Sequence, residues 1–106
     1  MAWNWWTRLR GFRGHIDLID AYQVTGWAAD RWGLAQELTI QVDGRAIDRI
    51  VPGYIRGDLP KRFGKPSNVG FDYVFEDPLP GGAILSITDA VGRQLSNSPQ
   101  IIPPAP

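Results

Sequence analysis

The chain has 106 residues, no cysteine and a formal net charge of zero, which fits one small domain and excludes disulfides and thiolate metal sites. Its arm, residues 1–13, carries three arginines and no acid, whereas residues 14–106 carry eight Lys/Arg against eleven Asp/Glu. This mildly acidic body argues against nucleic-acid binding, which needs a continuous basic face. No stretch approaches the roughly 20 apolar residues of a membrane span, and no signal-peptide pattern is present. With Met1 as the native start, we expect a cytoplasmic protein, either free or peripheral on the inner membrane.

The arm is rich in tryptophan and arginine. On a helical wheel Trp5, Leu9 and Phe12 share one side and the arginines flank it, as in a helix that lies in a membrane interface. Tryptophan favours interfacial depth and arginine favours anionic headgroups, but both residue types also dominate protein interfaces. Stacking on a sugar and packing on the chain's own body stay open as alternatives. The candidate residues for contact with a membrane surface or a protein partner are Trp3, Trp5, Trp6, Arg8, Arg10 and Phe12.

Residues 15–30 predict two β-strands joined by a turn. Alternation in the first strand places Ile16 and Leu18 on one face. In the second strand, Gly26 weakens the strand unless a neighbour has to approach closely, so we expect a tight contact at this position. We expect Trp27, the next residue, to fill the core between two sheets.

The clearest element is a hairpin in the middle of the chain. Leu38, Ile40 and Val42 alternate with polar residues, which is the pattern of a half-buried strand. Asp43-Gly44 suits a type I′ turn, where both residues need a positive φ. The return strand ends at the following Pro-Gly pair.

The second half of the chain continues the β pattern, apart from a short helical turn expected in DLPKRFG. Phe71, Tyr73 and Phe75 alternate and predict one aromatic face. A turn in PLPGG leads into the strand AILSITD, and a short last strand is expected near RQLSNS. About seven short strands predict an all-β protein, an immunoglobulin-like or jelly-roll antiparallel sandwich over residues 14–99. A loosely held Pro-rich tail is expected over residues 100–106.

No constellation of catalytic residues emerges. The single histidine, His15, has no cysteine to pair with, and we expect it to be a half-exposed strand residue. Paired carboxylates fall at strand ends and turns, where aspartate accepts local hydrogen bonds, and no loop has the spacing of a calcium site. We therefore expect a non-enzyme without cofactor or metal. The candidate ligand-binding residues are two aromatics expected in loops, Trp32 and Tyr54.

Five segments in order, GHIDLIDAYQVTGWAAD, VDG, IRGDL, NVGFDYVF and LSNSP, make the chain similar to a family of small β modules. These modules are found beside glycosyltransferases, methyltransferases and related proteins of bacterial surface-polysaccharide systems. The resemblance spans roughly residues 14–99 and implies a sandwich that accompanies glycan-handling enzymes without being catalytic. Its pattern positions in this chain are Gly26, Trp27, Asp43, Gly44, Arg56, Asp58, Gly70 and Phe71.

Residues and resemblance together predict a non-catalytic binding or adaptor module of a bacterial envelope or polysaccharide-related system. The arm would tether this module to a membrane surface or a protein partner. Two alternatives stay open: a carbohydrate-binding module that uses loop aromatics, and a structural subunit of a homo-oligomer.

Overall fold

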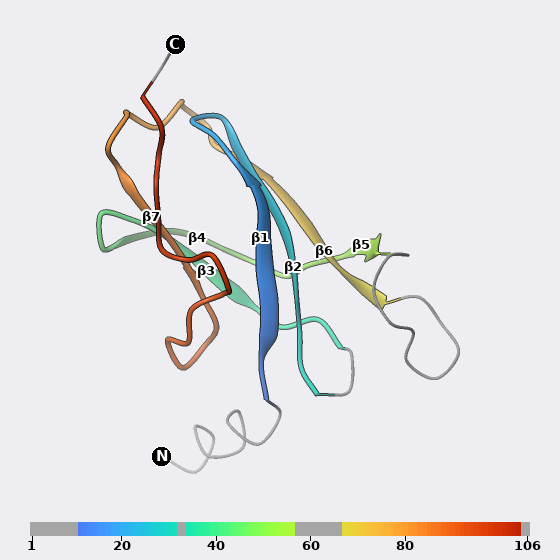
Figure 1. Ribbon diagram of the computed structural model, residues 1–106. Helices are drawn as coiled ribbons and strands as arrows, with labels where there is room; N and C mark the ends of the chain where they lie inside the picture. Colours follow the sequence, from blue (N-terminus) through green and yellow to red (C-terminus); the bar gives the residue numbers. More distant parts are fainter. Residues whose placement is uncertain (1–10, 32–33, 57–66, 105–106) are drawn as a thin grey trace.

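The computed structural model describes residues 11–31, 34–56 and 67–104, and these form two antiparallel sheets of four strands each (Figure 1). The first sheet has the order β1 (Arg13–Ile19), β2 (Gln23–Ala29), β6 (Ser67–Val74) and β5 (Tyr54–Arg56). The second sheet has the order β4 (Arg45–Ile50), β3 (Leu38–Val42), β7 (Ile84–Thr88) and β8 (Gln100–Ile101). No helix occurs in the described ranges. The expected all-β sandwich is confirmed.

The order of the strands is that of an immunoglobulin-like sandwich. When β1 to β8 are named A, B, C, C′, D, E, F and G, the first sheet reads A-B-E-D and the second C′-C-F-G. Immunoglobulin constant domains have the same A-B-E-D sheet facing C-F-G. This chain has no cysteine, so it lacks the disulfide that joins the two sheets in antibody domains. The two sheets are therefore held together without a covalent link.

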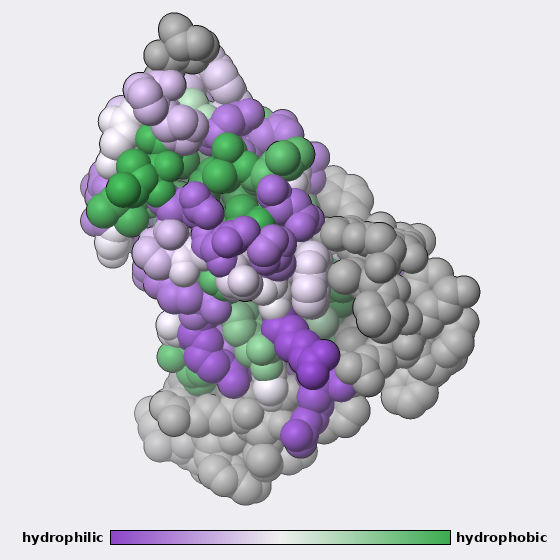
Figure 2. Space-filling view, in the orientation of Figure 1, coloured by the Kyte–Doolittle hydropathy of each residue, from purple (hydrophilic) through white to green (hydrophobic). Residues whose placement is uncertain are grey.

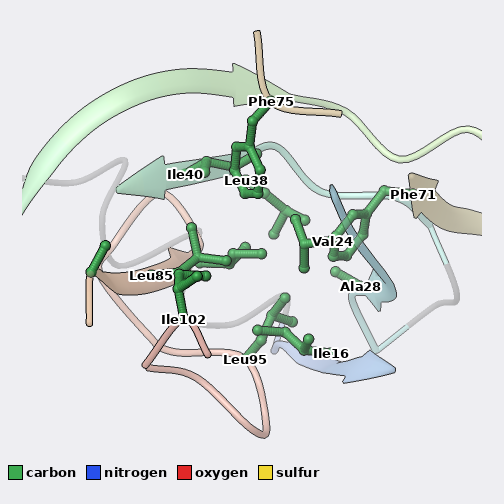
Figure 3. Packing of buried hydrophobic residues seen from close by; sticks show 12 residues of the cluster. Ile16, Val24, Ala28, Leu38, Ile40, Phe71, Phe75, Leu85, Leu95 and Ile102 are labelled. Carbon is green, nitrogen blue, oxygen red and sulfur yellow. The ribbon is translucent and has the colours of Figure 1, made fainter. Parts of the chain in front are cut away.

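The core lies between the sheets and follows the alternation of the strands (Figure 3). Leu38 and Ile40 are fully buried and Val42 half-buried, as the hairpin pattern predicted. Phe71 and Phe75 enter from the facing sheet, which confirms the aromatic face of β6. Because every second residue of a strand points inward, β2, β3 and β7 each contribute at least two buried side chains to this layer.

The central hairpin is confirmed in its turn type. Asp43 has a φ of 52° and Gly44 a φ of 80°, so both turn residues are in the left-handed region that a type I′ turn requires. The Asp43 carboxylate also accepts a hydrogen bond of 2.9 Å from the backbone N–H of Ile84. The turn is thus fixed to β7 as well as to its own two strands.

Two side chains of the first sheet point opposite to their predicted direction. In β1, Ile16 pairs with Gly26 of β2 and Leu18 pairs with Thr25, so Asp17 is the extra residue of a β-bulge. The bulge reverses the alternation: Ile16 is buried, whereas the Leu18 side chain is 67% exposed on the outer face.

Trp27 is also turned outward. Gly26 and Ala28, its neighbours in β2, are buried on the core side, so alternation places Trp27 on the outer face, where it is half-buried. The expected tight contact at Gly26 is confirmed, because a Cβ at this position would lie 2.3 Å from the His15 carbonyl oxygen. The prediction that Trp27 lies in the core is therefore wrong, because the inward-facing positions of the strand are those of its two neighbours.

The C-terminal part of the chain belongs to the sandwich. Residues 94–98, here called the clasp, contain isolated bridges instead of the strand predicted near RQLSNS. The last strand, β8, comes later, and Ile102 after it is fully buried in the core. The expectation of a loosely held segment from residue 100 onward fails for residues 100–102, because Gln100 and Ile101 pair with β7 and the Ile102 side chain is buried in the core.

Candidate functional site

The arm residues Trp3, Trp5, Trp6, Arg8 and Arg10 lie outside the described residues, as do Trp32 and the helical turn expected near Asp58. Tyr54, expected in a loop, is the first residue of β5, where its backbone pairs opposite Gly70 of β6. Phe12 is described, and it lies against the body immediately before β1. The candidate site within the described residues is therefore the junction between the arm and the sandwich.

The backbone of the arm is held at Gly11. The buried side chain of Gln36 donates a hydrogen bond of 2.6 Å from its Nε2 to the Gly11 carbonyl oxygen. Gly11 has a φ of 74°, a conformation that glycine adopts without strain. A Cβ on Gly11 would lie 3.6 Å from the Cβ of Arg31, so the loop after β2 stands directly beside it. The arm thus leaves the body from a fixed point.

The next residue, Phe12, packs on its own domain. Its ring is half-buried against the core cluster, and the Cζ of Arg93 lies 5.5 Å from the ring centroid. At this distance an arginine is attracted to the face of an aromatic ring. Six arm residues were expected to contact a membrane or partner. Phe12 is the one among them that the structure describes, and its side chain packs against the sandwich instead.

A buried carboxylate positions Arg93. Asp89 accepts hydrogen bonds from the backbone N–H groups of Val91 (3.1 Å) and Arg93 (2.8 Å) through one carboxylate oxygen. Its other oxygen accepts a hydrogen bond of 2.6 Å from the Arg93 Nε. Asp89 therefore organises the turn after β7 and, through Arg93, the packing of Phe12.

A second buried aspartate shapes the loop after β2 in a similar way. Asp30 is 1% exposed, and one of its carboxylate oxygens accepts a hydrogen bond of 3.0 Å from the backbone N–H of Leu34. The backbone N–H of Asp30 donates to the Leu34 carbonyl oxygen at 2.9 Å. The loop consequently places Arg31 beside Gly11 and leaves the Leu34 side chain exposed at the surface.

Sequence reasoning missed these two aspartates and Gln36. The signal that could have found the aspartates is Asp-x-x-Gly directly after an apolar strand, which occurs at Asp30-Arg-Trp-Gly and at Asp89-Ala-Val-Gly. Aspartate accepts hydrogen bonds from the backbone just after it, and glycine supplies the positive φ that closes the turn. Gly92 has a φ of 89°, as the turn in Asp-x-x-Gly requires. Gln36 has no comparable signal, because its partner lies 25 residues earlier.

The other polar residues predicted from sequence have structural partners. His15 is half-buried in β1, as expected, and its Nε2 lies 3.1 Å from the Nδ2 of Asn97 in the clasp. The Asp20 carboxylate accepts hydrogen bonds from the backbone N–H groups of Tyr22 (2.7 Å) and Gln23 (2.9 Å), which confirms the local role expected for a turn aspartate. Across the described part of the chain, every buried side-chain nitrogen or oxygen has a partner.

Comparison with known proteins gives no relative: no family model, curated protein or solved structure matches the chain. Among the residues described, no helix has the length and apolar character needed to cross a bilayer. In the same residues, no three side chains of the His, Cys, Asp and Glu types come together as metal ligands.

Proposed function

We propose that this protein is a non-catalytic binding module that is tethered through its arm to another surface, foremost a membrane. The observation that supports this proposal is the fixed attachment of the arm. Gln36 holds the Gly11 carbonyl group, and Arg93 lies over the ring of Phe12. A tether that carries a load has to be joined firmly to the body, and this junction meets that need.

Composition supports a membrane surface as the target. Residues 1–10 contain three tryptophans, two arginines and no acidic residue. These residue types favour the interface of an anionic bilayer, and a segment this short would bind weakly and reversibly. The sequence resemblance supports a bacterial envelope or polysaccharide-related setting for the module.

The test is flotation of the full chain with vesicles of phosphatidylcholine and phosphatidylglycerol at low and moderate salt. The matched truncation removes residues 2–10 and keeps Gly11 and Phe12, because these two residues are part of the body. We expect the full chain to float, less so at higher salt, and the truncated chain to stay in the lower fractions with its fold intact by circular dichroism. Equal flotation of both chains, or of neither, would contradict the membrane tether. A protein partner would then be sought by crosslinking through the arm.

A second candidate function, carbohydrate binding, is favoured by the position of Trp27. This half-buried side chain lies on the outer face of the first sheet, and its register partner Gly70 carries no side chain. Gly70 pairs in turn with Tyr54, so the two aromatic residues stand in one row across three strands. Trp27→Ala should abolish any retention on immobilised polysaccharide, whereas deletion of residues 2–10 should leave it unchanged.

A further inference from the structure

The part of the first sheet that lies farthest from the arm junction carries only negative charge. Residues 17–25 and 72–77 contain no lysine, arginine or histidine. The nearest arginine or lysine along β1 is Arg13, at the opposite end of this strand. We call the exposed residues of the two segments the acidic face. Its acids, all exposed, are Asp17, Asp20, Asp72, Glu76 and Asp77.

Strand pairing brings the residues of the acidic face together. Leu18 of β1 and Asp72 of β6 are both register partners of Thr25 in β2, so the three residues form one row across the outer face of the sheet. The next row contains Gln23 of β2 and its partner Val74 of β6. The acidic face is therefore one continuous surface over three strands.

The turn between β1 and β2 extends this surface. The carbonyl oxygen of Tyr22 in the turn accepts a hydrogen bond of 2.9 Å from the backbone N–H of Phe75. This bond places the turn beside the end of β6, which Glu76 and Asp77 follow directly. The acids of the turn and those after β6 thus surround the same end of the sheet.

Large apolar side chains are exposed among these acids. Leu18 is 67% exposed, Tyr22 64% and Val74 63%. Figure 2 shows apolar, green atoms interrupted by hydrophilic ones in the upper part of the molecule, where the β1–β2 turn lies in Figure 1. An apolar surface surrounded by charge of one sign is complementary to a partner that is both apolar and basic.

This chain itself contains such a segment. Residues 1–10 carry three tryptophans, one leucine and two arginines, and no acidic residue. Ten extended residues span roughly 33 Å, whereas the seven residues of β1 span about 23 Å. The arm is therefore long enough to reach from Gly11 to the far end of β1.

The start of the arm also permits this path. To lie along the outer face of the first sheet, the chain has to reverse its direction before β1. Gly11 has a φ of 74°, which is a conformation found where a chain turns sharply. Gly11 also lies beside Arg31, directly after β2, so the reversal takes place at the end of the first sheet.

We infer that the acidic face binds the arm of its own chain when no membrane is present. The arginines of the arm pair with the exposed carboxylates, and its tryptophans cover Leu18 and Val74. The arm of a second copy offers the same contacts but pays the entropy cost of association, whereas attachment to the body supplies an effective concentration of about 1 mM. Contacts too weak to join two chains at micromolar concentration therefore suffice within one chain.

The inference deepens the membrane tether proposed above and rests on it for the competing partner. The acidic face and an anionic bilayer bind the same arginines and tryptophans, so the arm engages one of them at a time. The acidic face thereby holds these apolar residues out of water until the chain meets a membrane.

The test uses the full chain in lipid-free solution. Because the chain has no cysteine, Thr7→Cys provides a single site for a spin label on the arm. We expect the label to broaden the NMR amide signals of residues 17–25 and 72–77. The signals of Thr39, Gln41 and Ser86, on the outer face of the second sheet, should stay sharp.

A mixture of two preparations separates contact within one chain from contact between chains. Spin-labelled chain without isotope is added to isotope-labelled chain without the spin label, and the signals should remain sharp. Broadening in this mixture would place the arm on a second copy and overturn the inference. An unbroadened acidic face in the first experiment, with a chain that still floats on vesicles, would overturn the inference and leave the tether standing. A broadened face with a chain that does not float would support the docking and refute the tether.

The apolar contact is tested by Leu18→Ser, which should remove most of the broadening. Ile101→Ser is the matched control, because Ile101 is also 67% exposed. It lies on the outer face of the second sheet, since the next residue, Ile102, is buried in the core. Equal broadening in the two variants would contradict a specific contact with the acidic face.

The charged contact is tested by salt. Broadening of the acidic face should weaken as the salt concentration rises, because interactions between exposed charges are screened beyond about 8 Å at physiological ionic strength. Broadening that is independent of salt would contradict the pairing of arginines with the exposed carboxylates.

Discussion

At the scale of single residues, Gly26 decides how closely β1 and β2 can pair over the core. A Cβ there would lie 2.3 Å from the His15 carbonyl oxygen and 2.9 Å from the Cζ of Phe71. The oxygen belongs to the backbone of the paired strand, and the ring is buried in the core. Neither neighbour can move without loss of a hydrogen bond or of packing.

Gly26→Ala should therefore lower the free energy of unfolding by about 3 kcal/mol through overpacking. The matched control is Gly53→Ala, because nothing lies within 4 Å of a Cβ at Gly53. This control should change stability by no more than about 0.5 kcal/mol. Urea unfolding followed by tryptophan fluorescence measures both, and equal stabilities of the two variants would contradict the close approach at Gly26.

Also at the residue scale, Tyr73 links the two sheets through a titratable group. Its hydroxyl donates a hydrogen bond of 2.9 Å to Asp48 on the edge strand β4. Burial, followed by the hydrogen bond to Asp48 and the negative charges of Asp48 and Glu76, raises the pKa of Tyr73 above its ordinary value of 10.0. The unfolded chain therefore loses this proton before the folded chain does.

Tyr73 should make the fold sensitive to alkali. Its contribution to stability is complete below about pH 10 and is lost as the pH rises through the raised pKa of the folded state. Tyr73→Phe should cost about 1 kcal/mol at neutral pH, through the missing hydrogen bond, and this difference should shrink above pH 10. Urea unfolding of the wild type and of Tyr73→Phe, below and above pH 10, measures this difference in stability. A difference that stays constant with pH would refute the coupling between Tyr73 ionisation and stability.

At the scale of elements, the turn after β7 depends on one buried carboxylate. Asp89→Asn keeps the shape of the side chain but removes the charge that pairs with Arg93. Because the arginine is about one-third exposed, we expect a loss of only about 2 kcal/mol. Phe12 should become more exposed as Arg93 is released, which hydrogen exchange at residues 11–13 would report. Asp72→Asn, on the exposed face of β6, is the control and should have little effect on either measurement.

The elements also show which structural features local sequence could predict. The hairpin with Asp43-Gly44 was predictable because its strands, its turn and its burial all depend on neighbouring residues. The outward direction of Leu18 was not, since it depends on a bulge in the pairing of β1 with β2. Tyr54 was placed in a loop because a three-residue strand next to Pro-Gly has no periodicity to detect.

The same limit applies to the candidate site. The arm was recognised from its composition, but its junction with the body involves Gln36 and Arg93, which are distant in sequence and hold it from two loops. Trp27 was predicted to lie in the core because tryptophan is large and apolar, and the structure instead buries the glycine beside it. Alternation alone could not decide which of the two neighbours faces inward.

At the scale of the whole molecule, the clasp closes one side of the sandwich. The backbone N–H of Ile16 donates to the Ser96 carbonyl oxygen at 3.0 Å, and the N–H of Ser96 donates to the Gly14 carbonyl oxygen at 3.0 Å. These bonds join β1 of the first sheet to a segment of the second. They also occupy the outer edge of β1, which would otherwise offer free backbone groups to another chain.

Ser96→Pro removes the N–H that bonds to Gly14 and should lower stability by about 3 kcal/mol. It should also raise self-association, because the edge of β1 becomes available for pairing. Ser96→Ala keeps the backbone donor and is the matched control, since the Ser96 side chain is exposed. Thermal unfolding and light scattering measure the two effects, and a monomeric proline variant of unchanged stability would show that the clasp is dispensable.

Because β1 is bonded to β2 along one side and to the clasp along the other, it is also suited to bear mechanical tension. A pull on residues 1–10 enters the body at Gly11 and runs on along β1, while the hydrogen bonds lie across this strand. Such a force loads the bonds on both sides together, in shear, instead of peeling them apart one by one. The strand that receives the tether is thus secured on both sides against a steady pull.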